Sequence, residues 1–390
     1  MPAQPKPLDL VHGASPTGDP WLLTPGPLTT SPTVKEAMLH DYGSRDTHFI
    51  AVNANMRKRL TALVNGGDDF VCVPLQGSGT FVVEAMLGNF VGPKDKLLIL
   101  VNGAYGTRMA RICDYYGREF VVQETPEDVP VDTQALDRAL SEDPDITHVA
   151  VVHCETTSGI LNPIEDVSEI VKKHGRRLLV DAMSAFGAIP LDSRVVHFDA
   201  AVASSNKCLE GVPGLGFCIA RKDALAATKD SSPSLSLDLH DQWQAMEGNG
   251  QWRFTPPTHC ILAFDKALDE FEEEGGVAGR GGRYRENCRI LVEGMSALGF
   301  STLLPDALQA PIIVTFHMPA DPKFDFQEFY DRLRARNFVI YPGKLTVADS
   351  FRIGCIGRLG ADEMHAALAV IRETLGEMGV TNCAPAETAA

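Results

Sequence analysis

The sequence is short of basic side chains. Its 390 residues include 35 lysines and arginines against 51 aspartates and glutamates, a formal net charge of −16. Phosphate backbones are held by positively charged surfaces, so a nucleic-acid partner is not expected. The sequence also lacks any apolar run near the roughly 18–20 residues that span a bilayer, and its N-terminus has no apolar leader. We therefore expect a cytoplasmic protein without a membrane partner.

Patterns that form disulfides or bind metals are missing as well. The nine cysteines include no CxxC pair and lie mostly in apolar segments, which is typical of reduced thiols in a cytosolic protein. The eleven histidines show no HExxH or comparable spacing, so no metal is expected. His153 and Cys154 are sequence neighbours, but adjacent side chains in a strand point to opposite faces, which argues against a catalytic Cys–His pair.

The distribution of apolar residues predicts two domains. Between residues 70 and 220, short apolar runs alternate with amphipathic stretches, a pattern typical of a mostly parallel sheet, here of seven strands, covered by helices on both faces. After residue 260 the pattern indicates a smaller α+β domain with an antiparallel sheet. We expect a flexible lead-in over residues 1–20 and a large α/β domain over 21–260, whose first residues pack with the small domain. The small domain follows over 261–378, with a flexible tail over 379–390.

Two ionisable residues lie where apolar runs end, which is where open α/β sheets bind their ligands. Asp181 ends the run LLVD, and Lys207 follows FDAAVASS. Alone, Lys207 would be assigned to the surface, but a carboxylate at the end of a buried strand is costly unless it meets a cation. Pyridoxal 5′-phosphate accounts for both residues, because its ring nitrogen pairs with an aspartate and its aldehyde forms a Schiff base with a lysine. We predict that Asp181 pairs with the ring nitrogen and that Lys207 forms the Schiff base and transfers the proton.

The segment Gly77-Ser78-Gly79-Thr80 directly precedes a helical pattern. Glycines allow close backbone approach and a helix N-terminus offers free N–H groups to an anion, so this segment is a candidate phosphate site. A tight turn with a Ser or Thr cap is the alternative. The segment lacks the GK[ST] ending of nucleotide-triphosphate loops and the spacing of a dinucleotide fingerprint.

Three further residues are candidates with structural alternatives. Tyr105 follows an apolar run and either stacks on the pyridine ring or packs internally. Thr156 closes another run and either binds the phenolic oxygen of the ring or caps the strand. Arg352 lies inside the apolar run SFRIGCIG, where a guanidinium either binds a substrate carboxylate or forms an internal ion pair.

Ten segments in order along residues 21–370 resemble one family closely. They are LLTPGPLTTSPTVKEAML, QGSGT, NGAYGTRM, VVHCETTSGILNPI, LVDAMSAFGAIPLD, SSNKCLEGVPGLGF, SLSLDLHDQW, WRFTPPTH, FVIYPGK and SFRIGCIG. The family is that of the 2-aminoethylphosphonate–pyruvate transaminases, class V members of the fold-type I pyridoxal-phosphate enzymes. The resemblance implies that 2-aminoethylphosphonate and pyruvate are converted to phosphonoacetaldehyde and L-alanine.

The resemblance also implies roles for individual residues. Thr255, in WRFTPPTH, corresponds to a threonine that reaches the phosphate from the partner subunit, which implies a homodimer with shared active sites. Arg352 would bind the carboxylate of the amino acceptor and is also a candidate for the phosphonate. Arg45 either serves the phosphonate or faces solvent. The residues that the resemblance places around the cofactor are Ser78, Gly79, Thr80, Tyr105, Thr156, Asp181, Ser205, Asn206, Lys207 and Thr255.

Three alternatives remain open. Another class V transaminase, acting on serine and pyruvate or on alanine and glyoxylate, would share the lysine, the aspartate and the arginine. A lyase acting on a hydroxylated aminophosphonate would use the same cofactor without a keto-acid acceptor. A ligand-binding protein on an inactive scaffold is disfavoured because both Asp181 and Lys207 are present.

Overall fold

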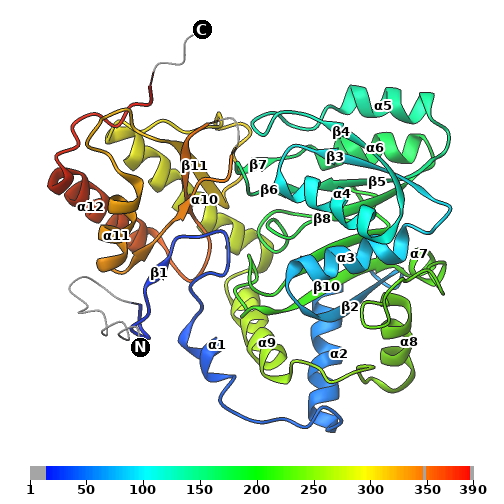
Figure 1. The fold of residues 1–390 in the computed structure, drawn as a ribbon. Coiled ribbons are helices and arrows are strands. Elements are labelled where there is room, and N and C mark those ends of the chain that lie inside the picture. Colours follow the sequence, from blue (N-terminus) through cyan, green and yellow to red (C-terminus); the bar gives the residue numbers. More distant parts are fainter. Residues whose placement is uncertain (1–14, 346–347, 387–390) are drawn as a thin grey trace, which may run out of the picture.

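The computed structural model describes residues 15–345 and 348–386, and its largest element is a seven-stranded sheet (Figure 1). Its strands run in the order β2-β10-β9-β8-β5-β3-β4, and only β10 is antiparallel to its neighbours. The expected mostly parallel sheet of seven strands is thus confirmed. The strands are β2 (Phe70–Gly77), β3 (Lys96–Val101), β4 (Glu119–Glu124), β5 (Ile146–Val152), β8 (Arg177–Asp181), β9 (Ala200–Ser204) and β10 (Gly214–Arg221).

Helices cover both faces of this sheet, which explains why its strands read as continuous apolar runs. One face packs on α2 (Thr47–Ala62), α5 (Thr133–Glu142), α6 (Ile164–Lys173) and α9 (Thr258–Glu273). The other face packs on α3 (Gly79–Phe90), α4 (Ala104–Tyr116), α7 (Lys222–Ala226) and α8 (Leu239–Asn249). Helices that follow parallel strands bring their N-termini to the carboxyl edge of the sheet, as α3 does after β2 and α4 after β3.

The small domain contains an antiparallel sheet in the order β11-β14-β13. The strands are β11 (Ile313–His317), β13 (Tyr341–Pro342) and β14 (Ser350–Gly354), and they pack with α10 (Gly276–Ala297), α11 (Phe326–Ala335) and α12 (Ala361–Met378). The N-terminal strand β1 (Trp21–Leu22) pairs with β12 (Phe338–Val339) of this domain. Helix α1 (Pro32–Glu36) follows, and a short hairpin of β6 (Cys154–Glu155) and β7 (Ile160–Leu161) extends from the large domain.

The structure corrects two of the expected domain limits. Helix α9 was expected to open the small domain, but Ile261, Phe264 and Leu268 belong to the core beneath the large sheet. In the expected flexible tail, Val380 and Cys383 are buried against the small domain, and Asp321 accepts hydrogen bonds from the Thr381 and Asn382 backbones. Residues 1–14 of the lead-in and 387–390 of the tail lie outside the described residues.

A buried ionic network connects α10 to the turn that follows β9. The Arg280 guanidinium is fully buried, donates to the Cys208 carbonyl oxygen at 2.5 Å and binds Glu274 at 2.7 Å. Glu210 in the same turn accepts from the Tyr284 hydroxyl at 2.6 Å and pairs with Arg283 at 2.7 Å. Breaking any one of these contacts would leave a buried charge without its partner, which is energetically costly. The network therefore holds the turn after β9 against α10. In the described part of the chain, no helix is both long enough and apolar enough to cross a membrane.

Candidate active site

A cavity of about 520 Å³ opens at the carboxyl edge of the large sheet. Its walls come from the ends of β2, β8 and β9 and from the beginnings of α3 and α4. The structure therefore brings together residues that are far apart in the sequence. The expected site residues that line this cavity are Ser78, Gly79, Thr80, Tyr105, Asp181, Asn206 and Lys207.

Lys207 lies in the turn between β9 and β10, and its Nζ donates to the Pro25 carbonyl oxygen at 2.8 Å. Burial, with a smaller contribution from the charge of Arg352, lowers the pKa of its amine to about 8. Gly26 passes so close that an added Cβ would lie 2.7 Å from Lys207 Cδ, and its φ of +120° also favours glycine. The segment Pro25–Pro27 thus shapes the surroundings of an amine that is easily deprotonated.

Asp181 is the last residue of β8 and is almost fully buried. Burial raises the pKa of its carboxyl to about 6, although the Met183 N–H donates to Oδ1 at 2.9 Å. The positive charges of Lys207 and Arg108 oppose this rise. Among the ion pairs of the described residues, however, none joins Asp181 to a base. The carboxylate therefore faces the cavity without a direct cationic partner.

The N-terminus of α3 forms another part of the cavity wall. Ser78 is the N-cap residue in an extended conformation, but its side chain caps no backbone N–H, so its hydroxyl is available to a ligand. An added Cβ on Gly79 would lie 2.5 Å from Met183 Sδ, so a larger residue here would require the Met183 side chain to move. Free backbone N–H groups and small side chains at a helix N-terminus suit an anion such as a phosphate.

Arg108 lines the same cavity, and our sequence reasoning missed it. Its Nη1 donates to Thr80 Oγ1 at 3.0 Å, and its guanidinium carbon lies 4.8 Å from the centre of the Tyr105 ring. Tyr105 and Arg108 are three residues apart on α4, which places them on one face of the helix. That spacing from Tyr105 is the signal in the sequence that could have pointed to Arg108.

Arg352 reaches the site from the small domain. It is buried in β14, where Nη1 donates to the Thr156 carbonyl oxygen at 2.7 Å and Nε to the Pro342 carbonyl oxygen at 3.1 Å. No carboxylate in the described part of the chain lies within ion-pair distance of it, so the internal ion pair considered above is not formed. Beside it, Thr156 Oγ1 is buried and has no hydrogen-bond partner. Neither side chain is part of the cavity wall, but the charge of Arg352 contributes to the lowered pKa of Lys207.

Besides Thr156 and Arg352, three further expected site residues are not part of the wall of this cavity. Ser205 is buried, and its hydroxyl donates to the Val212 and Leu215 carbonyl oxygens at 2.6 and 3.2 Å, so it braces the turn rather than facing a ligand. Thr255 is exposed and lines a separate cavity of about 190 Å³ together with Phe81 and Phe254. Arg45 is exposed next to Asp46, the N-cap residue of α2.

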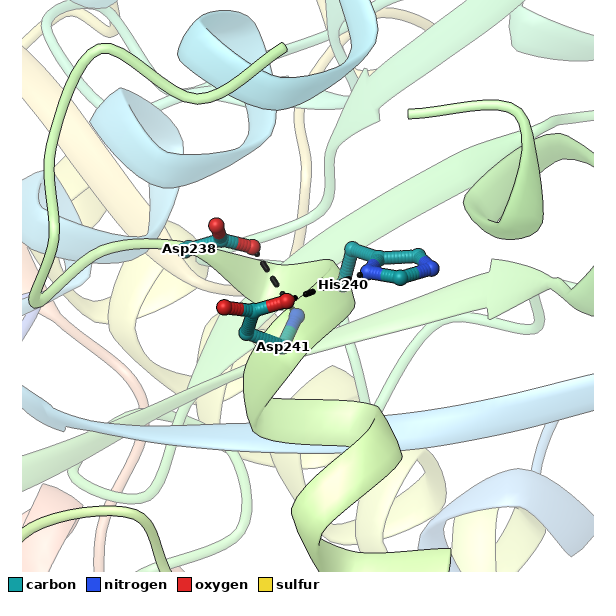
Figure 2. A group of neighbouring side chains, drawn as sticks. All are labelled: Asp238, His240 and Asp241. Atoms are coloured by element: carbon teal, nitrogen blue, oxygen red, sulfur yellow. Dashed lines mark hydrogen bonds and ion pairs between the residues drawn. The ribbon is translucent and has the colours of Figure 1, made fainter. Parts of the chain in front are cut away.

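Asp238, His240 and Asp241 are the one group of the described residues with metal-ligand proximity (Figure 2). Their contacts are explained by the start of α8, where Asp238 accepts from the Asp241 N–H at 2.9 Å and His240 Nδ1 lies 3.3 Å from Asp241 Oδ1. None of the three residues lines the cavity, and we assign the group no metal.

Comparison with known proteins relates this geometry to a family. The model of the class-V aminotransferases matches residues 34–345. A 2-aminoethylphosphonate–pyruvate transaminase of Pseudomonas putida is 52% identical over 361 residues, which cover 93% of this chain and 98% of that protein. A 2-aminoethylphosphonate–pyruvate transaminase 2 of Burkholderia lata is 53% identical over 361 residues, covering 93% of this chain and 96% of that protein.

Solved structures show the same fold. The pyridoxamine–pyruvate aminotransferase of Mesorhizobium loti matches with a TM-score of 0.85 and 26% identity, covering 94% of each chain. The phosphoserine aminotransferase of Trichomonas vaginalis, solved with pyridoxal phosphate bound, matches with a TM-score of 0.72 and 18% identity, covering 90% of this chain and 99% of that chain. The described architecture is therefore that of the fold-type I aminotransferases.

The raised pKa of Asp181 predicts a stabilising substitution. Its folded pKa of about 6 exceeds the ordinary 3.8, so the folded protein binds the proton more tightly, and stability is lost as the pH rises through this range. We expect Asp181→Asn to raise the free energy of unfolding of the ligand-free protein at pH 7 by about 1–3 kcal/mol. The gain should shrink at pH 5, as measured by denaturant unfolding at both pH values.

Asp192→Asn is the control with the opposite sign. The Arg194 side chain beside Asp192 lowers the pKa of that carboxyl to about 2, so its charge stabilises the fold at neutral pH. This variant should lose stability at pH 7. A ligand-free Asp181→Asn protein that is less stable than wild type at pH 7 would contradict the assignment of Asp181 as a destabilising buried charge.

Proposed function

The chain belongs to the class-V aminotransferase family, and we propose that it moves the amino group of 2-aminoethylphosphonate to pyruvate, giving phosphonoacetaldehyde and L-alanine. The observation that carries this proposal is the identity of 52–53% to proteins named for that reaction, maintained over 93% of the chain. The donor would make the protein an enzyme of phosphonate catabolism. Relatives acting on other amines, such as the pyridoxamine–pyruvate aminotransferase, share far less of the sequence.

The cofactor is pyridoxal 5′-phosphate, and the residues of the cavity fit it. The N-terminus of α3 would hold the phosphate, with the free Ser78 hydroxyl and with Thr80, to which Arg108 is already bound. The unpartnered Thr156 Oγ1 supplies a polar atom for the phenolic oxygen. Tyr105 is in position to pack against the ring, and the buried Asp181 carboxylate would hold the ring nitrogen.

Pyridoxal phosphate, when bound, supplies an aldehyde that reacts with amines and a ring that accepts electrons from the substrate carbon. Lys207 contributes an amine whose pKa of about 8 leaves a substantial neutral fraction near neutral pH, so its Nζ can both accept and return a proton. Asp181, as a carboxylate, would keep the ring nitrogen of the cofactor protonated, because a buried positive charge is stabilised by a negative charge beside it. Lys207 would therefore transfer the proton, and Asp181 would maintain the positive charge of the ring nitrogen.

The substrates of this reaction alternate between a phosphonate and a carboxylate. Arg352 donates from two of its nitrogens to backbone carbonyl oxygens and keeps Nη2 for an anion, which suits the carboxylate of pyruvate. Arg108 and Arg45 are additional candidates for the phosphonate. Arg108 already lies in the cavity, whereas Arg45 is exposed on its own subunit and would serve a neighbouring one.

We also propose a cytoplasmic homodimer in which each subunit completes the site of the other. Phe81 and Phe254 are about half exposed and flank the second cavity, which Thr255 lines. Phe81 directly follows Thr80 at the N-terminus of α3, where the phosphate would bind. A subunit covering these rings would therefore bring its own Thr255 close to the phosphate. Exposed aromatic side chains of this kind are typical of interface cores.

A donor assay tests the proposed reaction. With pyruvate as acceptor, we expect 2-aminoethylphosphonate to support L-alanine formation far better than taurine, β-alanine or L-serine. Lys207→Ala should abolish turnover and the visible absorbance of the bound cofactor, because no other amine in the cavity wall can replace it. The exposed Lys222→Ala on α7 is the matched control and should behave like wild type. Ammonia release without pyruvate, or a preference for L-serine, would overturn the proposal.

Arg352→Ala should raise KM for pyruvate and lower kcat/KM. The loss should correspond to about 2–5 kcal/mol, because a buried anion would be left without its cation. Arg352→Lys should recover only part of the loss, since an ammonium cannot form the two-pronged contact. Arg358→Ala, which removes an exposed arginine just beyond β14, is the control. Wild-type pyruvate kinetics in Arg352→Ala would remove this residue from the acceptor site.

Mixed dimers test whether the active sites are shared. Thr255→Glu should abolish activity, because the new carboxylate would meet the cofactor phosphate of the neighbouring subunit. Mixing it with Lys207→Ala subunits and allowing exchange should recover about a quarter of wild-type activity, since half of the dimers are mixed and each has one intact site. If Thr255 served only its own subunit, the mixture would stay inactive.

A further inference from the structure

Glu155 is a buried carboxylate for which the proposed reaction has no use. It ends β6 and is completely buried, and no base of the described residues forms an ion pair with it. Burial raises the pKa of its carboxyl to about 7, and the charge of Asp181 adds to this rise. Burying such a group is costly unless its hydrogen bonds accomplish something specific. Those bonds converge on a single feature, the beginning of α4.

Each carboxylate oxygen of Glu155 accepts hydrogen bonds. Oε2 is bound by the first turn of α4, and Oε1 is bound by Thr157. The Tyr105 N–H donates to Oε2 at 3.1 Å. Oε1 accepts from the Thr157 hydroxyl at 2.5 Å and from the Thr157 N–H at 3.2 Å. The same hydroxyl accepts from the Ala104 N–H at 3.2 Å. Glu155 and Thr157 together thus satisfy the first two N–H groups of α4.

The residue that would ordinarily cap α4 cannot do so. Gly103 occupies the N-cap position and has no side chain, and an added Cβ there would lie 2.5 Å from the carboxyl carbon of Glu155. The carboxylate therefore occupies the space of a local capping side chain. A negative charge at a helix N-terminus is also favoured by the helix dipole.

The first turn of α4 carries the two side chains that define one wall of the cavity. Tyr105 is the second residue of the helix. Arg108 lies about one turn further along and is hydrogen-bonded to Thr80 at the N-terminus of α3. A rigid cap at this position fixes the plane of the ring and the direction of the guanidinium together. An ordinary structural cap would stabilise the helix without any effect on a ligand in the cavity.

We propose that Glu155 is a positioning residue of the cofactor site, which fixes Tyr105 and Arg108 by capping α4 from the β6–β7 hairpin. The proposal rests on the cofactor site described above. It predicts that loss of the carboxylate loosens the tyrosine ring and the arginine while the chemistry of Lys207 is retained. The effect should therefore appear in cofactor affinity and in the asymmetry of the cofactor's surroundings before it appears in the proton-transfer step.

The experiment compares Glu155→Gln and Glu155→Ala with wild type in cofactor dissociation constant and in the visible circular dichroism of the bound cofactor. Glu155→Ala should weaken cofactor binding roughly tenfold to a hundredfold, as expected for hydrogen bonds to a charged group. It should also diminish the dichroic band. Glu155→Gln keeps one acceptor oxygen and should fall between the two. Gly103→Ala, which pushes the carboxylate aside, should reproduce the effect of Glu155→Ala.

Asp199→Asn separates positioning from general stability. Asp199 is also a buried carboxylate that accepts from a backbone N–H, at 2.9 Å from Leu178, but it lies before β9 at the opposite edge of the sheet. This variant should alter stability only and leave cofactor affinity and dichroism unchanged. If Glu155→Gln and Glu155→Ala behave in the same way as Asp199→Asn, the positioning role is overturned. A visible band that persists in Lys207→Ala would instead overturn the proposed function.

Discussion

The central constraint in this molecule is a lysine and an aspartate that are buried in one cavity without forming an ion pair with each other. Burial lowers the pKa of Lys207 to about 8 and raises that of Asp181 to about 6, so the charged form of each group is less favourable in the cavity than in water. Direct contact would relieve both but would also occupy the cavity. A ligand that offers an aldehyde to the amine and a protonated nitrogen to the carboxylate relieves both at once, which is what pyridoxal phosphate provides.

Much of the surrounding structure keeps these two groups in place. The turn that carries Lys207 is bound through the Cys208 carbonyl oxygen and Glu210 to the arginines of α10, so the lysine is fixed to a helix that also packs in the small domain. On its other side, Pro25 and Gly26 contact the lysine directly. The N-terminal segment continues into β1, which pairs with the small domain. The small domain is therefore connected to the lysine from two directions.

The elements of the fold and the chemical centre of the site could be predicted from the sequence because both follow from local patterns. Continuous apolar runs identified the seven strands, and the polar residues at their ends identified Asp181, Lys207 and the segment beginning at Ser78. Arg108 and Glu155 could not be found in this way, because their importance lies in contacts between separate strands and helices. The apolar face of α9 indicated burial, but a single helix does not reveal which of two cores it joins.

Although the chain as a whole is acidic, three basic side chains lie close together near the cavity. Lys344 lies near Arg352 and Arg108, and its pKa is lowered by burial and by the charges of these two arginines. Three cations that repel one another are stabilised by an anion placed among them, and Glu155 supplies only part of that charge. A substrate with two negative charges would supply more than one with a single charge. Because charges are screened beyond about 8 Å at physiological ionic strength, the net charge of −16 does not oppose this local attraction. A phosphonate donor is therefore compatible with an acidic protein, and the group of Lys344, Arg352 and Arg108, of which Arg108 lines the cavity, favours it over a donor with a single carboxylate.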